Sequence, residues 1–175
     1  MNINFLLFLI TASFLMSFGL PKNIQKKVDK EIEKTFNIET FNFTAVLIDA
    51  EINKELPSKF GENNFFKIET NNTLLGYAYL SKAPSKTAEF DYLVLLDKDL
   101  IVLKSKVLIY REDYGGEIGS SRWLRQFIGK SDSDTLILDK NIIAISGATI
   151  SVRSMTNAMN DLLKSLKILQ SKKIL

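Results

Sequence analysis

The sequence predicts an α+β fold: a mainly antiparallel sheet with an N-terminal helix, a short middle helix and a long C-terminal helix packed on it. Three observations predict it. Apolar residues recur at helical spacing near both ends of the chain, strand-like runs joined by turns lie between them, and a short Ser-capped apolar segment follows those runs. A chain of 175 residues fits one domain with a substantial core, which we assign to residues 20–175.

Residues 1–19 are typical of a signal peptide or an N-terminal anchor. A short apolar run, Phe5 to Leu15, is followed by small residues at Ser17 and Gly19. The run is shorter than the ~20 residues that a membrane helix needs, and cleavage after Gly19 fits the pattern. Because residues 1–4 contain no Lys or Arg, a buried or interfacial helix and an uncleaved anchor stay open. We expect an exported protein, periplasmic or at the outer face of the cytoplasmic membrane.

The first predicted helix begins after Pro21, which suits the first turn of a helix. Ile24, Val28, Ile32 and Phe36 recur every four residues, with charged residues between them. This spacing predicts an amphipathic helix whose narrow apolar stripe packs on the domain. A membrane-surface helix is the alternative, and the mixed charge signs argue against it.

Strand-like runs fill the middle of the chain. Residues 41–48 fit either a strand or a helix, and residues 51–64 are rich in turn residues and read as a loop. Residues 65–70 and 73–80 form a hairpin, because the Asn pair between them tolerates positive φ. Gly76 inside the second strand indicates a bulge or a close approach by another segment.

A second strand pair, residues 90–96 and 100–110, turns at Asp97-Lys98-Asp99. After a glycine-rich loop, Ser120 or Ser121 caps a short helix that Gly129 ends. Trp123 falls on the apolar face of this helix, so we expect it in the core. Residues 136–138 and 142–145 resemble a strand, a turn and another strand.

The final helix is expected from about Ser151 to Leu169. Seven apolar residues share one face at helical spacing: Val152, Met155, Met159, Leu162, Leu163, Leu166 and Leu169. The methionines in this set are core filling rather than metal ligands.

Composition excludes several kinds of chemistry. The chain has no Cys and no His, which excludes disulfides, thiolate metal sites, His-ligated zinc and Ser-His catalysis. The formal net charge is +3 with scattered lysines, so no nucleic-acid footprint is indicated. Redox chemistry in this chain would need a bound cofactor.

Two segments are suited to ligand contacts, one to a phosphate and the other to a planar group. Small residues in the stretch Ile145 to Ser151 let backbone approach a phosphate at a helix start, where unpaired amides and the dipole favour an anion. The alternative is a tight turn with Thr149 or Ser151 as the capping hydroxyl. In residues 111–119, Gly115 and Gly116 permit a planar ligand to approach backbone, and Tyr114 can stack on it. The alternative there is an ordinary loop.

The stretch Ser146-Gly147-Ala148-Thr149 resembles the flavinylation motif of the FMN-binding domain family. That family includes the C subunit of the sodium-pumping NADH:quinone oxidoreductase and the G subunit of Rnf complexes. The likeness spans about residues 65–169 and includes Gly76-Tyr77-Ala78-Tyr79, the segment 110–118 and the segment 123–130.

The resemblance implies an electron carrier with FMN attached as a phosphoester to Thr149 by a flavin transferase, and without a substrate site of its own. Its partners would be membrane or periplasmic electron-transfer proteins. Carried onto this chain, the cofactor-binding residues are Thr149, Ser146, Gly147, Ala148, Ser151, Arg153, Glu112, Tyr114, Gly115 and Gly116. We expect no catalytic residues and no metal ligands.

The chain departs from the family pattern at two places. Ile143 stands where the family has an Asp six positions before the acceptor Thr, and Glu112-Asp113-Tyr114-Gly115 replaces a Glu-Thr-Pro-Gly form. Covalent FMN, non-covalent FMN and loss of the cofactor therefore stay open. The alternative function is a secreted structural or binding module of the same fold. A hydrolase that uses Ser146 or Thr149 is disfavoured, because the chain has no His base.

Overall fold

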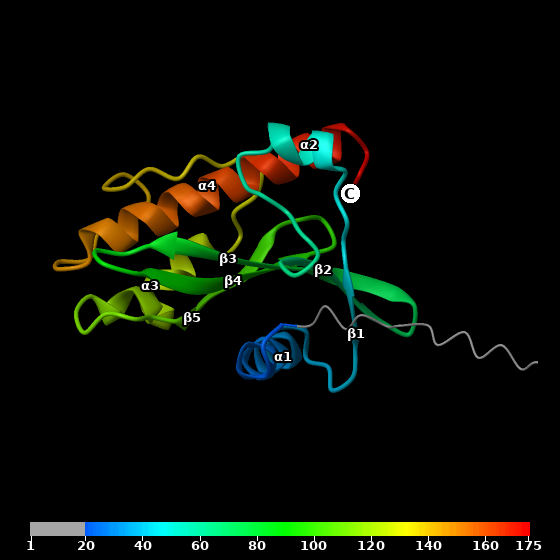
Figure 1. The fold of residues 1–175 in the computed structure, drawn as a ribbon, viewed down its shortest axis with the longest axis horizontal. Helices are drawn as coiled ribbons and strands as arrows, with labels where there is room; N and C mark the ends of the chain where they lie inside the picture. The colour runs from blue at the N-terminus through cyan, green and yellow to red at the C-terminus, as the bar shows by residue number, and fades with distance from the viewer. Residues whose placement is uncertain (1–19) are drawn as a thin grey trace, which may run out of the picture.

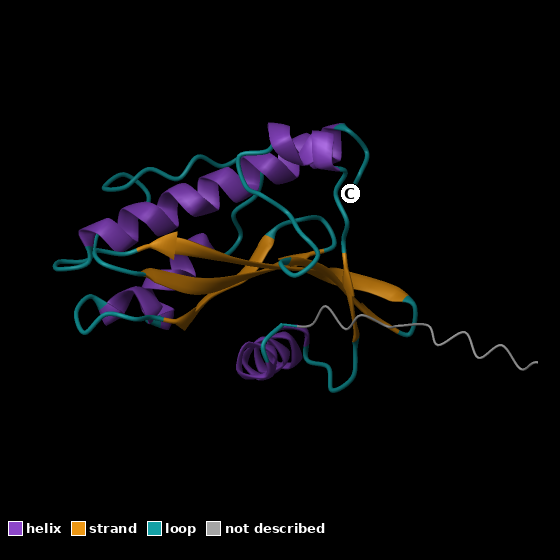
Figure 2. Cartoon of the chain, viewed as in Figure 1, coloured by secondary structure: helices purple, strands orange, loops and turns teal. Residues whose placement is uncertain are grey.

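The computed structural model describes residues 20–175 and confirms the α+β fold, with five antiparallel strands and helices on both sides (Figures 1 and 2). The predicted signal or anchor in residues 1–19 lies outside the described residues. The elements are α1 Lys22–Phe36, β1 Asn42–Ala45, α2 Ala50–Glu55, β2 Phe65–Thr70, β3 Thr73–Pro84, β4 Glu89–Asp97, β5 Val102–Ile109, the 3₁₀ turn η1 Gly116–Gly119, α3 Ser121–Leu124, the 3₁₀ turn η2 Arg125–Phe127 and α4 Thr149–Ser171.

The sheet is an antiparallel meander in the order β1-β2-β3-β4-β5. Asn71 and Asn72 connect β2 to β3 with φ values of 49° and 59°, which confirms the predicted hairpin. The β2–β3 register shifts between Ile68 and Glu69, opposite Gly76. The predicted bulge is therefore present, and it bends the longest strand of the sheet.

Both faces of the sheet are covered, because successive side chains of a strand point to opposite sides. On β3, Tyr77 and Tyr79 join the core under α4, whereas Ala78 and Leu80 join a second core under α1. Figure 1 shows α4 and α1 on opposite faces of the sheet. The apolar stripes predicted for these two helices are the faces that they bury.

Two sequence interpretations were wrong. Residues 51–64 are not wholly a loop, because the helix α2 (Ala50–Glu55) extends into them. The Asp49 carboxylate caps this helix by accepting hydrogen bonds from the backbone amides of Glu51 (2.9 Å) and Ile52 (3.4 Å). Residues 136–145 do not form two strands, only a single bridge between Leu138 and Ile142.

Side chains replace the missing strand ladder in this segment. The side-chain amide of Asn160, on α4, accepts a hydrogen bond from the backbone N–H of Leu136 and donates one to the backbone carbonyl of Leu136, each at 2.8 Å.

The segment 41–48, for which the sequence left strand and helix open, contains the edge strand β1. Ser120 caps α3 and Gly129 has a φ of 79°, as predicted. Within residues 20–175, no helix combines the length and apolar content that crossing a bilayer requires.

Candidate functional site

A groove of about 420 Å³ lies beside the first turn of α4. Its volume falls in the range of about 300–1,000 Å³ that is usual for small-molecule sites. Six of the ten predicted site residues line it: Glu112, Tyr114, Gly147, Ala148, Thr149 and Ser151. The groove therefore joins the glycine-rich loop after β5 to the Ser-Gly-Ala-Thr stretch, although about 30 residues separate them in the sequence.

Thr149 is the first residue of α4 and is exposed to solvent. The helix begins after Ala148 without a side-chain cap, so the structure does not have the alternative arrangement in which Thr149 or Ser151 is the capping hydroxyl. The first intrahelical hydrogen bond comes from the Val152 amide to the Ala148 carbonyl, at 2.9 Å. The amides of the first turn and the positive end of the helix dipole are thus directed at whatever lies in front of Thr149.

Tyr110 ties the glycine-rich loop to α4. Its hydroxyl donates to the Tyr114 carbonyl at 3.1 Å, and its oxygen lies 3.1 Å from the buried Ser151 hydroxyl oxygen. The Ser151 side chain is therefore engaged within the protein. The ring of Tyr114 is 84% exposed at the edge of the groove, available to a ligand or a partner.

Gly115 is the point at which the loop packs against the Ser-Gly-Ala-Thr stretch. It has a φ of 79°, and a Cβ there would lie 3.0 Å from the Tyr110 hydroxyl and 3.1 Å from the Ala148 Cβ. Both the backbone conformation and the available space thus favour glycine. Gly116, the next residue, begins η1, and a Cβ added to it would meet no atom within 4 Å.

Replacing Gly115 with Ala is expected to destabilise the protein by about 1–3 kcal/mol, through left-handed backbone strain and crowding at Ala148. Gly116→Ala is the matched control, and we expect it to change stability by less than about 0.5 kcal/mol. Urea unfolding measures the free energy of unfolding of both variants, provided that its dependence on urea concentration has the same slope as in the wild type. Equal midpoints for the two variants would contradict the packing of the loop on Ala148.

Glu112 secures the turn between β3 and β4. Its Oε1 accepts hydrogen bonds from the amides of Thr87 (2.7 Å) and Ala88 (3.2 Å). The pKa of the Glu112 carboxyl is lowered, first by a hydrogen bond from the Ser85 hydroxyl and then by the one from the Thr87 amide. This anchoring is therefore lost as the pH falls through the acidic range of the carboxyl. The anchored turn brings Lys86 to the groove, where its ammonium supplies a positive charge.

The remaining predicted site residues lie around the groove. Arg153 and Thr149 share a smaller hollow of about 210 Å³ on the other side of the first turn. Ser146 lines a separate groove of about 590 Å³ with Trp123, Gln126 and Ile143. Gly115 and Gly116 shape the loop without lining these hollows.

Trp123 and Gln126 hold the irregular segment that leads into Ser146. The Trp123 indole nitrogen donates to the Ile143 carbonyl, and the Gln126 Oε1 accepts from the Ile143 amide, both at 2.7 Å. Trp123 is 5% exposed, so its predicted place in the core is confirmed. The Ile143 side chain is 73% exposed and borders the 590 Å³ groove.

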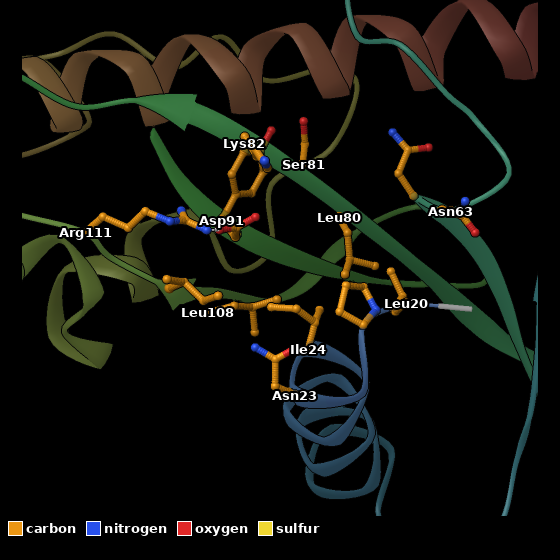
Figure 3. Close-up of a pocket in the computed structure, with 14 residues that line it drawn as sticks. Leu20, Asn23, Ile24, Asn63, Leu80, Ser81, Lys82, Asp91, Leu108 and Arg111 are labelled. Atoms are coloured by element: carbon orange, nitrogen blue, oxygen red, sulfur yellow. Dashed lines mark ion pairs between the residues drawn. The ribbon is translucent and has the colours of Figure 1, made fainter. Parts of the chain in front are cut away.

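A cavity of about 640 Å³, larger than the groove beside Thr149, contains none of the predicted site residues. It lies at the N-terminal end of α1, between Leu20 and Ile24 on one side and Leu80 and Leu108 of the sheet on the other (Figure 3). Arg111 and Asp91 form an ion pair at one end of it. Size alone therefore does not identify the functional site.

Sequence reasoning missed Lys86, Tyr110 and Ile150 as groove residues. The position of Ile150 immediately after Thr149 was an available signal. Nothing in the sequence indicated Lys86, because its approach depends on the β3–β4 turn folding back toward α4.

In residues 20–175, no three His, Cys, Asp or Glu side chains are grouped as a metal ion would require.

Comparisons with known proteins agree with the resemblance found in the sequence. Residues 86–164 match the model of the FMN-binding domain family, which supports FMN as the cofactor. Among solved structures, NqrC of Shewanella oneidensis is similar with a TM-score of 0.52 and 16% identity, over 74% of this chain and 69% of that one. At this identity the likeness concerns the fold. Comparison with curated proteins gives no match.

Proposed function

We propose that this chain, whose residues 86–164 match the FMN-binding domain family, is an exported electron carrier with FMN attached as a phosphoester to Thr149. The observation that carries the proposal is the position of Thr149. Its side chain is exposed at the uncapped start of α4, next to a groove large enough for a flavin. A carrier of this kind has no substrate site of its own.

The residues around Thr149 fit a phosphate. The first-turn amides and the helix dipole favour the negative charge. Arg153 shares the small hollow with Thr149, and Lys86 lines the groove on the other side. Two cations and a helix terminus thus lie in or beside the hollows that Thr149 lines, and they would hold the phosphate oxygens by charge-assisted hydrogen bonds.

Attachment needs a flavin transferase as a partner, as the family resemblance implies. The ester forms between the Thr149 hydroxyl oxygen and the flavin phosphorus. The hydroxyl proton is lost, and the bond between that phosphorus and its leaving group on the donor nucleotide breaks. The exposed side chain of Thr149 gives such an enzyme access to the oxygen.

When bound, FMN supplies one- and two-electron transfer, and the protein supplies orientation and local electrostatics. Tyr114 and Ile150 would border the ring at the edge of the groove, where their side chains are 84% and 52% exposed. Gly115 and Gly116 keep the loop backbone close to this groove without side chains in the way.

The same exposed side chains are suited to partner docking. Tyr114, Ile150 and Ile143 are three of the seven large apolar residues that residues 20–175 expose, and all three border the hollows around Ser146 to Thr149. Exposed apolar groups that gather at one place typically mark an interaction site. We infer that membrane or periplasmic electron-transfer proteins dock here, which brings their redox centres to the flavin.

Intact mass of the protein co-expressed with a flavin transferase tests the proposal. We expect a gain equal to FMN less one water and fluorescence that survives a denaturing gel. A colourless protein with the mass of its residues alone would support the alternative, a secreted structural or binding module of the same fold. Colour that is lost on denaturation would instead indicate non-covalent FMN.

Ile143 occupies the position at which the family has an Asp, and restoring that Asp is expected to increase flavin attachment. The Ile143 side chain is mostly exposed and its backbone is held by Trp123 and Gln126, so Ile143→Asp should fold normally. We expect faster covalent incorporation in a time course of in-gel fluorescence. Ile137→Asp, at another exposed Ile, is the control. Equal rates for both variants would show that the carboxylate plays no part in this chain.

A further inference from the structure

The outer face of α1 carries a regular row of lysines. Lys22, Lys26, Lys30 and Lys34 follow at four-residue spacing, and all four are exposed. At 3.6 residues per turn they fall within about 120° of the helix circumference and extend over about 18 Å. Ile24, Val28 and Ile32 are buried on the opposite side, so the lysine row faces away from the sheet.

The acidic residues of α1 largely leave this row unneutralised. Glu31 pairs with Lys104 of β5 at 2.6 Å, and Asp29 accepts a hydrogen bond from Gln25 at 2.6 Å. Of the acidic residues, only Glu33 falls within the lysine sector by helical spacing. None of the four lysines forms an ion pair in the described part of the chain. By helical spacing, Asp29 lies at the edge of the row and Glu31 on the opposite side, so four lysines outnumber the one acidic residue within the sector.

We propose that the lysine row of α1 binds the headgroups of an anionic phospholipid surface. Lysines near such a surface each add attraction, and a straight row on one helix face suits a flat, extended array of negative charges. The helix would rest on the headgroups by its polar face, since its apolar face is already buried in the domain.

The sequence before α1 favours a lipid surface over an acidic protein or a nucleic acid. The apolar run Phe5 to Leu15 ends only six residues before Lys22, a distance of at most about 25 Å for an extended chain. In the uncleaved form of the chain, association of that run with a bilayer would hold the row near the headgroups. Because α1 and α4 cover opposite faces of the sheet, this orientation leaves α4, which begins at Thr149, on the side away from the lipid (Figure 1). The inference does not require the flavin, since a flavin-free chain carries the same helix.

Sedimentation of the full chain with vesicles of phosphatidylglycerol or phosphatidylcholine tests this proposal. We expect salt-sensitive binding to the anionic vesicles, and binding weakened at least about tenfold when all four lysines are changed to Gln. The charge-matched control changes Lys140, Lys164, Lys167 and Lys173 to Gln, four exposed lysines outside α1. An equal loss in the control, an unchanged affinity in the α1 variant, or equal binding to neutral vesicles would overturn the proposal.

A second measurement reports orientation. The chain has no Cys, so Asn23→Cys on α1 and Asn157→Cys on α4 each accept a single polarity-sensitive dye. Anionic vesicles are expected to shift the emission of the dye at position 23 and to leave that at position 157 unchanged. The reverse result would place α4 on the lipid and overturn the proposal, whether or not the protein carries FMN.

Discussion

Thr149→Ala is expected to abolish covalent flavin completely, because it removes the oxygen that forms the ester. The wild-type protein, co-expressed with a flavin transferase, should gain the mass of FMN less one water, and the variant should gain nothing. Thr149 is exposed and its side chain does not cap α4, so stability should change by less than about 0.5 kcal/mol. The loss can therefore be attributed to chemistry rather than to unfolding.

Three further variants separate the acceptor from its surroundings. Thr135→Ala makes the same substitution at an exposed Thr outside the groove and should keep full fluorescence. Ser146→Ala and Ser151→Ala test the other two hydroxyls of the motif and should keep the covalent mass. If Thr149→Ala remains flavinylated and one of the serine variants does not, the acceptor has been assigned to the wrong residue.

The sequence predicted correctly those turns and helices that are determined by residues within the same segment. The Asn71-Asn72 pair predicts its hairpin because the two residues themselves adopt the positive φ values that the turn needs. The α2 helix was missed although its capping residue Asp49 precedes it, since the turn residues that follow dominated the pattern. Residues 136–145 resembled strands because they contain short apolar runs. Their backbone instead forms turn hydrogen bonds to the Ile137 and Ile142 carbonyls and bonds to side chains such as Asn160 and Asn141.

The site residues also fall into those that the local sequence indicates and those that depend on tertiary contacts. Thr149 and its small neighbours could be found from the sequence, because the start of a helix and the motif coincide there. The role of Lys86 depends on Glu112 holding a turn 25 residues earlier in the chain, which is a tertiary contact. Likewise, the contact of the Ser151 hydroxyl with the Tyr110 hydroxyl joins residues that lie 41 positions apart in the sequence. Periodicity in one segment contains no information about such pairs.

Gly76→Ala is expected to produce the largest loss of stability, because the sheet has no room for a side chain there. A Cβ at this position would lie 2.0 Å from the Leu96 carbonyl oxygen and 3.0 Å from the ring of Phe36. The nearer atom is backbone of the strand β4, which cannot move without breaking the β3–β4 pairing. We expect a loss of about 3–5 kcal/mol, at the upper end for single substitutions.

Gly61→Ala is the control, since its Cβ would meet only the Asn64 Oδ1 at 4.0 Å and its φ is not positive. Removing backbone freedom at such a position typically stabilises a protein slightly, by about 0.4–1 kcal/mol. Urea unfolding of the two variants should therefore move in opposite directions. A Gly76→Ala protein as stable as wild type would contradict the close approach of β3 to the Leu96 carbonyl of β4.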